Sequence, residues 1–125
     1  MPVQYERDDA RRRVVITVDG PFQTSEILAV IARQHAENTW SYGMLYDLRR
    51  MTGQPTLADL LEVMDEAMSR GPAGRPRGPV ALLATSPSLY EIAGKYAALG
   101  HATFMIHVFR DLDAAGQWLA AETIP

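Results

Sequence analysis

The strongest constraint on the fold is that short apolar runs alternate with amphipathic segments along the chain. Three such runs, Met44–Leu48, Val80–Thr85 and Thr103–Phe109, have the length and composition of buried strands. Each is followed by a segment in which apolar residues recur every three or four positions, the spacing of a helix with one apolar face. Alternating strands and helices predict a sheet with a parallel core, because right-handed crossovers place helices on its faces.

The amino-terminal part of the sequence predicts a hairpin. Val3–Glu6 and Arg12–Asp19 have strand character, and the RDDA stretch between them favours a tight turn. The pair would add an antiparallel edge to the sheet. The complete order is ββαβαβαβα, an α/β fold with a single mixed sheet, and the 125 residues suit one domain spanning 1–125.

The first two helices have capping signals and apolar stripes. Thr24 or Ser25 can cap the first helix, and Thr56 can cap the second, where Asp59 completes a variant of the capping box. The stripe predicted to be buried in the first helix is Ile27, Leu28, Ile31, Ala32 and His35. In the second it is Leu57, Leu60, Leu61, Met64 and Met68, with Asp59, Glu62, Asp65 and Glu66 facing water.

The carboxyl-terminal half predicts two further helices. Gly71–Pro79 is a loop because it is rich in glycine and proline, and Ser86-Pro87 begins the third helix. Gly100 is a suitable end for that helix, and Asp111 or Asp113 can cap the last one. The predicted stripes are Leu89, Ile92, Ala93 and Tyr96, then Leu112, Ala115 and Leu119.

Composition argues against several classes of protein. The chain has no cysteine, which excludes a disulfide framework and thiolate chemistry, and its net charge of −3 argues against a nucleic-acid binder. No apolar stretch is long enough for a transmembrane segment, and no signal peptide is evident, so we expect a cytoplasmic protein.

Neither a metal site nor a catalytic site is predicted. The three histidines do not have a metal-ligand spacing: His35 falls on a helix stripe, His101 follows the Gly100 stop and should be exposed, and His107 lies inside a strand. No nucleophile, base and orienting group can be assembled from the sequence, so we expect neither a cofactor nor an enzyme. Trp40 and Trp118 lie near helix ends and are interpreted as packing residues.

Hydroxyls and cations gather where the parallel strands end. In an open α/β sheet this carboxyl edge, together with the helix amino termini, is where ligands bind. The candidate residues for binding a ligand or partner are Asp47, Arg49, Arg50, Thr52, Thr56, Ser86, Ser88 and Arg110. A structural interpretation competes with this one, in which each hydroxyl caps a helix and each arginine is a solvated strand end.

Asp47 ends a predicted strand, as does the phosphorylated Asp of a phospho-receiver domain. A receiver also needs an acid pair after its first parallel strand and a Lys after its fifth. Here Asp8 and Asp9 lie in the hairpin turn, and the only Lys, Lys95, lies inside a helix. Without a metal the phosphoryl chemistry lacks electrophilic assistance. We therefore interpret Asp47 as a structural acid that accepts bonds from loop N–H groups or from an arginine.

Three stretches together resemble the STAS domain in its stand-alone bacterial, SpoIIAA-like form. They are LYDLRRMTG followed by TLADLLEVMDEA, then VALLATSPSLYEIA, and the closing MIHVFRDLDAAGQWLA. The resemblance covers most of Tyr5–Ala121 and implies a SpoIIAA-like fold in a regulatory protein-interaction module. It also implies a phosphorylation switch in the loop RRMTGQPT, where Thr52 and Thr56 are the only hydroxyls and the family's Asp-Ser pair is missing.

Two functional hypotheses follow. In the first, a non-catalytic module binds another protein through Arg49–Thr56 and the acidic helix after it. In the alternative, the chain binds a small amphipathic or anionic, lipid-like ligand at the carboxyl edge of the sheet, where methionines lie near the hydroxyls and arginines. Some members of the group are also similar to CRAL-TRIO lipid-binding domains. The methionines are Met44, Met51, Met64, Met68 and Met105. A homodimer is compatible with either hypothesis.

Overall fold

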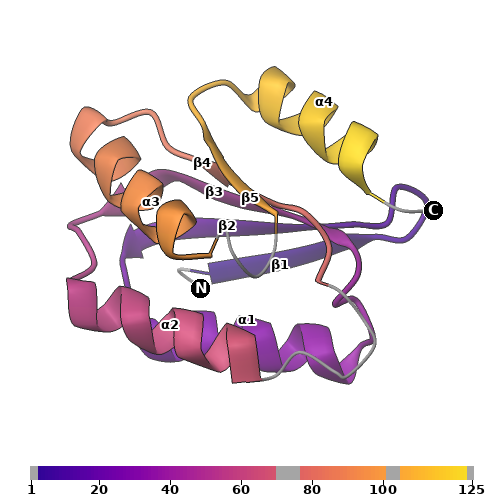
Figure 1. The fold of residues 1–125 in the computed structure, drawn as a ribbon, viewed down its shortest axis with the longest axis horizontal. Helices are drawn as coiled ribbons and strands as arrows, with labels where there is room; N and C mark the ends of the chain where they lie inside the picture. Colours follow the sequence, from indigo (N-terminus) through magenta and orange to yellow (C-terminus); the bar gives the residue numbers. More distant parts are fainter. Residues whose placement is uncertain (1–2, 70–76, 101–104, 124–125) are drawn as a thin grey trace.

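The computed structural model describes residues 3–69, 77–100 and 105–123 (Figure 1). The predicted order ββαβαβαβα is confirmed. The elements are β1 (Val3–Asp8), β2 (Arg13–Pro21), α1 (Thr24–Ala36), β3 (Gly43–Thr52), α2 (Leu57–Ser69), β4 (Val80–Leu83), α3 (Pro87–Gly100), β5 (Ile106–Phe109) and α4 (Leu112–Glu122).

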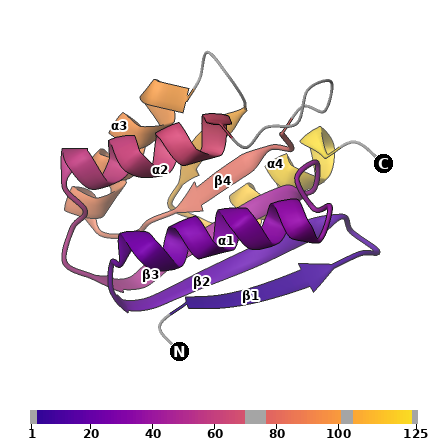
Figure 2. The same ribbon diagram turned by 90° about the horizontal axis from the view of Figure 1, so that it is seen from below.

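The five strands form one mixed sheet in the order β1-β2-β3-β4-β5, so neighbours in the sheet are also neighbours in the chain. β1 pairs with β2 antiparallel, and the remaining pairings are parallel. Successive right-handed crossovers in one direction place α1, α2 and α3 on the same face, while α4 covers the opposite face (Figure 2). Among the five strands that the structure describes, the order does not reverse, so these strands form no switch-point crevice of the kind that binds dinucleotides.

The core has two layers, one on each face of the sheet. The larger layer packs α1, α2 and α3 against side chains such as Ile16, Met44 and Ile106. The smaller layer joins Leu45 and Leu83 of the sheet to Ala115 and Leu119 of α4. The predicted packing roles of the two tryptophans are confirmed: Trp40 lies in the larger layer, and Trp118 packs against the smaller one.

The buried face of α1 differs from the prediction. The buried residues are Ile27, Val30, Ile31 and Gln34, and His35 is exposed. The helix is therefore rotated so that Gln34 points inward, where its side-chain N–H donates to the Thr39 carbonyl at 3.5 Å, and the Thr39 hydroxyl donates to the Gln34 carbonyl at 3.3 Å. These bonds satisfy the buried Gln34 side-chain N–H and the Thr39 hydroxyl, whereas Gln34 Oε1 is buried without a hydrogen-bond partner.

The apolar stripe of α2 is only partly buried. Leu60, Val63, Met64 and Ala67 face the core. The predicted burial of three other residues is wrong, since Leu57, Leu61 and Met68 are 63%, 48% and 52% exposed. The helix faces the core along the row Leu60, Val63, Met64 and Ala67. The row of Leu57, Leu61 and Met68 lies beside it and faces solvent.

Strand lengths also differ from the prediction. β3 extends to Thr52, beyond Leu48, because its end pairs with the end of β2 through Asp19, Gly20 and Pro21 after a register shift. β4 stops at Leu83, before Thr85. Parts of three predictions lie outside the described residues. They are Thr103 and Phe104 of the last strand, His101, and residues 71–76 of the predicted loop.

Candidate functional site

The predicted acid and its arginine partner both lie within β3. Asp47 accepts hydrogen bonds from the Arg49 backbone N–H at 3.1 Å and from Arg49 Nε and Nη2 at 2.9 and 2.8 Å. These bonds from Arg49 hold the pKa of Asp47 below its usual value. The expected bonding of Asp47 to a neighbouring N–H group and to an arginine is confirmed, and its use in binding a ligand or partner stays a prediction. Arg50 makes a longer contact with Asp19, at 3.8 Å.

The capping box at the start of α2 is confirmed in full. The Asp59 backbone N–H donates to Thr56 Oγ1 at 3.1 Å, and the Thr56 backbone N–H donates to Asp59 Oδ2 at 2.9 Å. The Thr24 hydroxyl donates to the other carboxylate oxygen of Asp59 at 3.1 Å, which ties the start of α1 to the start of α2. These bonds lower the pKa of Asp59, and the bond from the Thr56 backbone N–H has the largest effect.

The predicted caps of α1 and α4 have different outcomes. The prediction that Thr24 or Ser25 caps α1 is wrong. The cap residue is Gln23, and its side chain makes no capping bond. The Thr24 hydroxyl instead donates to Asp59. In α4 the choice between two acids is resolved, since Asp111 accepts from the Ala114 backbone N–H at 3.1 Å.

The remaining edge residues lie around the start of α3. Ser86 Oγ accepts from the Leu89 backbone N–H at 3.2 Å and lies 3.2 Å from Ser88 Oγ. The Arg110 guanidinium lies over the Tyr90 ring, 4.1 Å from its centroid. The hydroxyls of Thr56 and Ser86 thus cap helices, as the structural interpretation predicted. Their use in ligand or partner binding remains a prediction.

The face of the sheet that α4 covers has an open groove beside that helix. Asp47 and Arg49 line it, with Arg13 at the other end of the sheet and Leu45 in its floor. Arg13 Nη2 donates to the Gly116 carbonyl at 3.1 Å. The pKa of Arg13 is lowered, mainly because the guanidinium is partly buried. The predicted site residues are therefore not brought together. Asp47 and Arg49 lie on this face, Arg50 and Thr52 lie at the end of β3, Thr56 caps α2, and Ser86, Ser88 and Arg110 lie around the start of α3.

The histidines do not assemble into a site. His107 packs its ring 4.9 Å from Trp118 on the α4 face, and His35 is exposed on α1. In the described residues no group of three or more His, Cys, Asp or Glu side chains could hold a metal ion. None of the described helices is long and apolar enough to span a bilayer.

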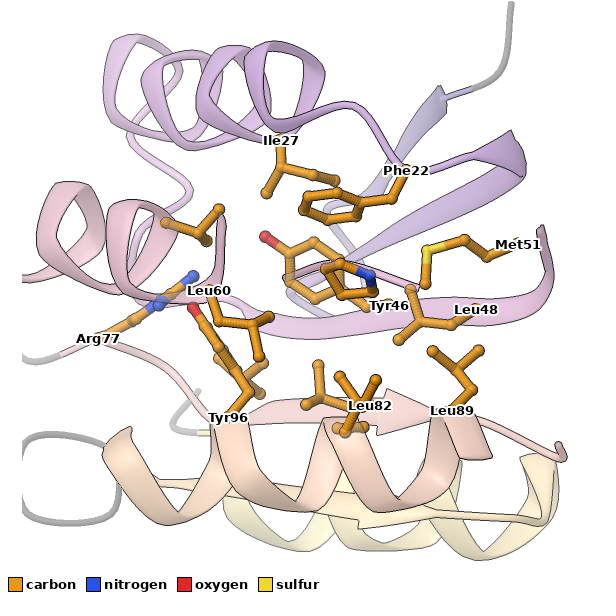
Figure 3. Close-up of a pocket in the computed structure, with 15 residues that line it drawn as sticks. Phe22, Ile27, Tyr46, Leu48, Met51, Leu60, Arg77, Leu82, Leu89 and Tyr96 are labelled. Atoms are coloured by element: carbon orange, nitrogen blue, oxygen red, sulfur yellow. The ribbon is translucent and has the colours of Figure 1, made fainter. Parts of the chain in front are cut away.

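An apolar cavity of about 70 Å³ lies between α2, α3 and the sheet (Figure 3). It is smaller than the roughly 300 Å³ of a pocket for a drug-sized ligand. Its walls come from five elements (α1, β3, α2, β4 and α3) and three connecting segments. The lining residues are Phe22, Ile27, Tyr46, Leu48, Met51, Pro55, Leu60, Val63, Arg77, Val80, Leu82, Leu89, Ile92, Ala93 and Tyr96.

Neither the cavity nor Arg77, the only charged residue among its described lining residues, was predicted from the sequence. Of the methionines proposed to line a ligand site, only Met51 does so among the described residues. The available signal was a tyrosine at an inward position of a strand, Tyr46, and another on a helix stripe, Tyr96. Buried phenols need polar partners, and here the Arg77 guanidinium lies beside them at the same end of the cavity.

Comparison with solved structures identifies the fold. An anti-sigma factor antagonist from Mycobacterium paratuberculosis matches with a TM-score of 0.63 at 15% identity, over 94% of this chain and 92% of that one. The chain has the SpoIIAA-like fold. Unphosphorylated SpoIIAA matches with a TM-score of 0.54 at 16% identity, over 93% and 96% of the two chains. An uncharacterised Shewanella loihica protein described as SpoIIAA-like matches with a TM-score of 0.62 at 13% identity, over 94% and 91%.

No family model and no curated protein sequence matches this chain. The STAS-type architecture expected from the LYDLRRMTG, VALLATSPSLYEIA and MIHVFRDLDAAGQWLA stretches is thus confirmed at the level of the fold.

Proposed function

We propose that this protein is a small, non-catalytic regulatory module that binds another protein through the β3–α2 passage and the outer face of α2. The observation that carries the proposal is the exposed apolar row Leu57, Leu61 and Met68, which crosses the solvent side of a helix. Anti-sigma factor antagonists with the same fold support a regulatory role.

The charge of α2 defines the chemistry of the partner. The helix carries four acids and no Lys or Arg between Leu57 and Ser69. A partner surface that combines apolar side chains with Lys or Arg would complement it, and the charged rim would steer association. Binding should therefore weaken as salt rises, because exposed charges are screened.

The experiment is an affinity capture with cross-linking from the native cells, using wild-type protein and two matched variants. Leu61→Asp places a charge in the α2 row, whereas Leu112→Asp changes an equally exposed leucine, 44% against 48%, on α4. A specific partner should be lost with Leu61→Asp and kept with Leu112→Asp. Equal recovery with both variants would count against the α2 face.

Regulation by phosphorylation belongs to the same proposal. One matching solved structure is phosphorylated SpoIIAA, at a TM-score of 0.56 and 18% identity. Of the two candidate acceptors, Thr56 already holds the α2 cap with its hydroxyl, whereas Thr52 is exposed at the end of β3. We infer that Thr52 is the better acceptor. Phosphopeptide mapping of protein from native cells should find phosphate on Thr52, and phosphate on Thr56 alone would contradict this assignment.

A further inference from the structure

The cavity between α2 and α3 is apolar along most of its length. Leu48, Met51 and Leu89 lie at one end, near the carboxyl edge of the sheet (Figure 3). Leu60 and Leu82 continue the walls inward. A cavity with such walls favours an apolar group, because water inside it would find few partners.

The other end of the cavity is polar. The hydroxyls of Tyr46 and Tyr96 both point toward the Arg77 guanidinium (Figure 3). The guanidinium packs over the Trp40 ring, 4.7 Å from its centroid, and this contact fixes its position. One cation and two phenols therefore converge at one end of an apolar channel.

Both phenols are hydrogen-bond donors at neutral pH. Burial raises the pKa of Tyr46 and raises the pKa of Tyr96 to about 12, although the positive charge of Arg77 acts to lower both. A phenol beside the Arg77 guanidinium keeps its own proton to donate. The polar end thus offers O–H and N–H donors to an acceptor with several lone pairs, the pattern that a carboxylate satisfies.

The charge and size of the cavity restrict the ligand. Among the described residues, no Asp or Glu lines the cavity. One water-sized group needs about 10–15 Å³ of such space, so about 70 Å³ accommodates roughly five to seven non-hydrogen atoms. We propose that the cavity binds a short-chain carboxylate of about butanoate size, with its carboxylate on Arg77, Tyr46 and Tyr96 and its alkyl chain toward Met51. This site is separate from the partner-binding face of α2.

The test is a titration of methyl-labelled protein with sodium acetate, butanoate, hexanoate and octanoate, followed by NMR. We expect saturable shifts of the Leu60, Leu82 and Leu89 methyl signals, with the tightest binding near butanoate. Butyramide has the same shape without the charge, and we expect it to bind at least about tenfold more weakly. Affinity that keeps rising to octanoate would overturn the size assignment and indicate a lipid-like ligand.

Variants assign the two ends of the site. Arg77→Met removes the charge and should weaken butanoate binding at least about tenfold, whereas Arg33→Met, at an arginine over the Tyr5 ring, should leave it unchanged. Ala93→Val narrows the cavity from α3 and should abolish binding while the signals of α4 stay in place. Shifts that do not saturate in wild type, or equal affinity in Ala93→Val, would overturn the proposal.

Discussion

Thr56→Ala tests how much the capping box at the start of α2 contributes to stability. The substitution deletes the acceptor for the Asp59 backbone N–H, a bond of 3.1 Å, and leaves the reciprocal bond to the Asp59 carboxylate in place. Thr56 is exposed, so no cavity is created. The loss of the cap alone should lower the free energy of unfolding by about 1 kcal/mol.

Urea unfolding followed by far-ultraviolet circular dichroism measures this change. The midpoint should fall at an unchanged slope, because the surface exposed on unfolding is the same. Thr56→Ser keeps the oxygen and is the control, with an expected loss of only a few tenths of a kcal/mol. Equal losses in Thr56→Ala and Thr56→Ser, or no loss in Thr56→Ala, would refute the capping argument.

Further predictions concern packing and charge. Gly78→Ala should cost about 1–3 kcal/mol in a thermal melt, because its Cβ would overlap the Ser41 and Tyr42 carbonyl groups. Leu60→Ala should cost about 2–3 kcal/mol in urea unfolding, whereas Leu61→Ala should stay within about 0.5 kcal/mol; equal losses would contradict the assigned rotation of α2. The lowered pKa of Asp47 means that its stabilisation is fully present above its usual pKa of 3.8 and is lost as pH falls through the lower folded value. Asp47→Asn should therefore reduce the acid sensitivity of unfolding, and an identical pH profile would contradict this.

Features that depend on a few neighbouring residues could be predicted from the sequence. The capping box needs only Thr56 and Asp59, three positions apart, and its two bonds form wherever a helix begins there. The alternation of short apolar runs and amphipathic segments likewise predicted the order of strands and helices. The Asp47–Arg49 pair is also local, since two positions separate the partners.

Features that depend on rotation or distant packing could not be predicted in this way. The predicted stripe and the observed buried face of α1 share Ile27 and Ile31 and differ in whether His35 or Gln34 points inward. The partner of Gln34 is Thr39, which lies beyond the end of the helix. The polar end of the cavity joins Arg77, from a glycine- and proline-rich segment, to a strand and a later helix. Nothing in the local spacing of these residues relates them to one another.

The sequential order of the strands has a consequence for how the chain folds. Residues paired across neighbouring parallel strands are 30, 36 and 26 positions apart: Arg13 with Gly43, Met44 with Val80, and Val80 with Ile106. Each closure has a similar and modest entropic cost, because that cost grows only with the logarithm of loop length. A strand leaving the ribosome therefore always finds its partner in the strand synthesised just before it. The sheet can grow at one edge during translation, without waiting for a distant segment to arrive.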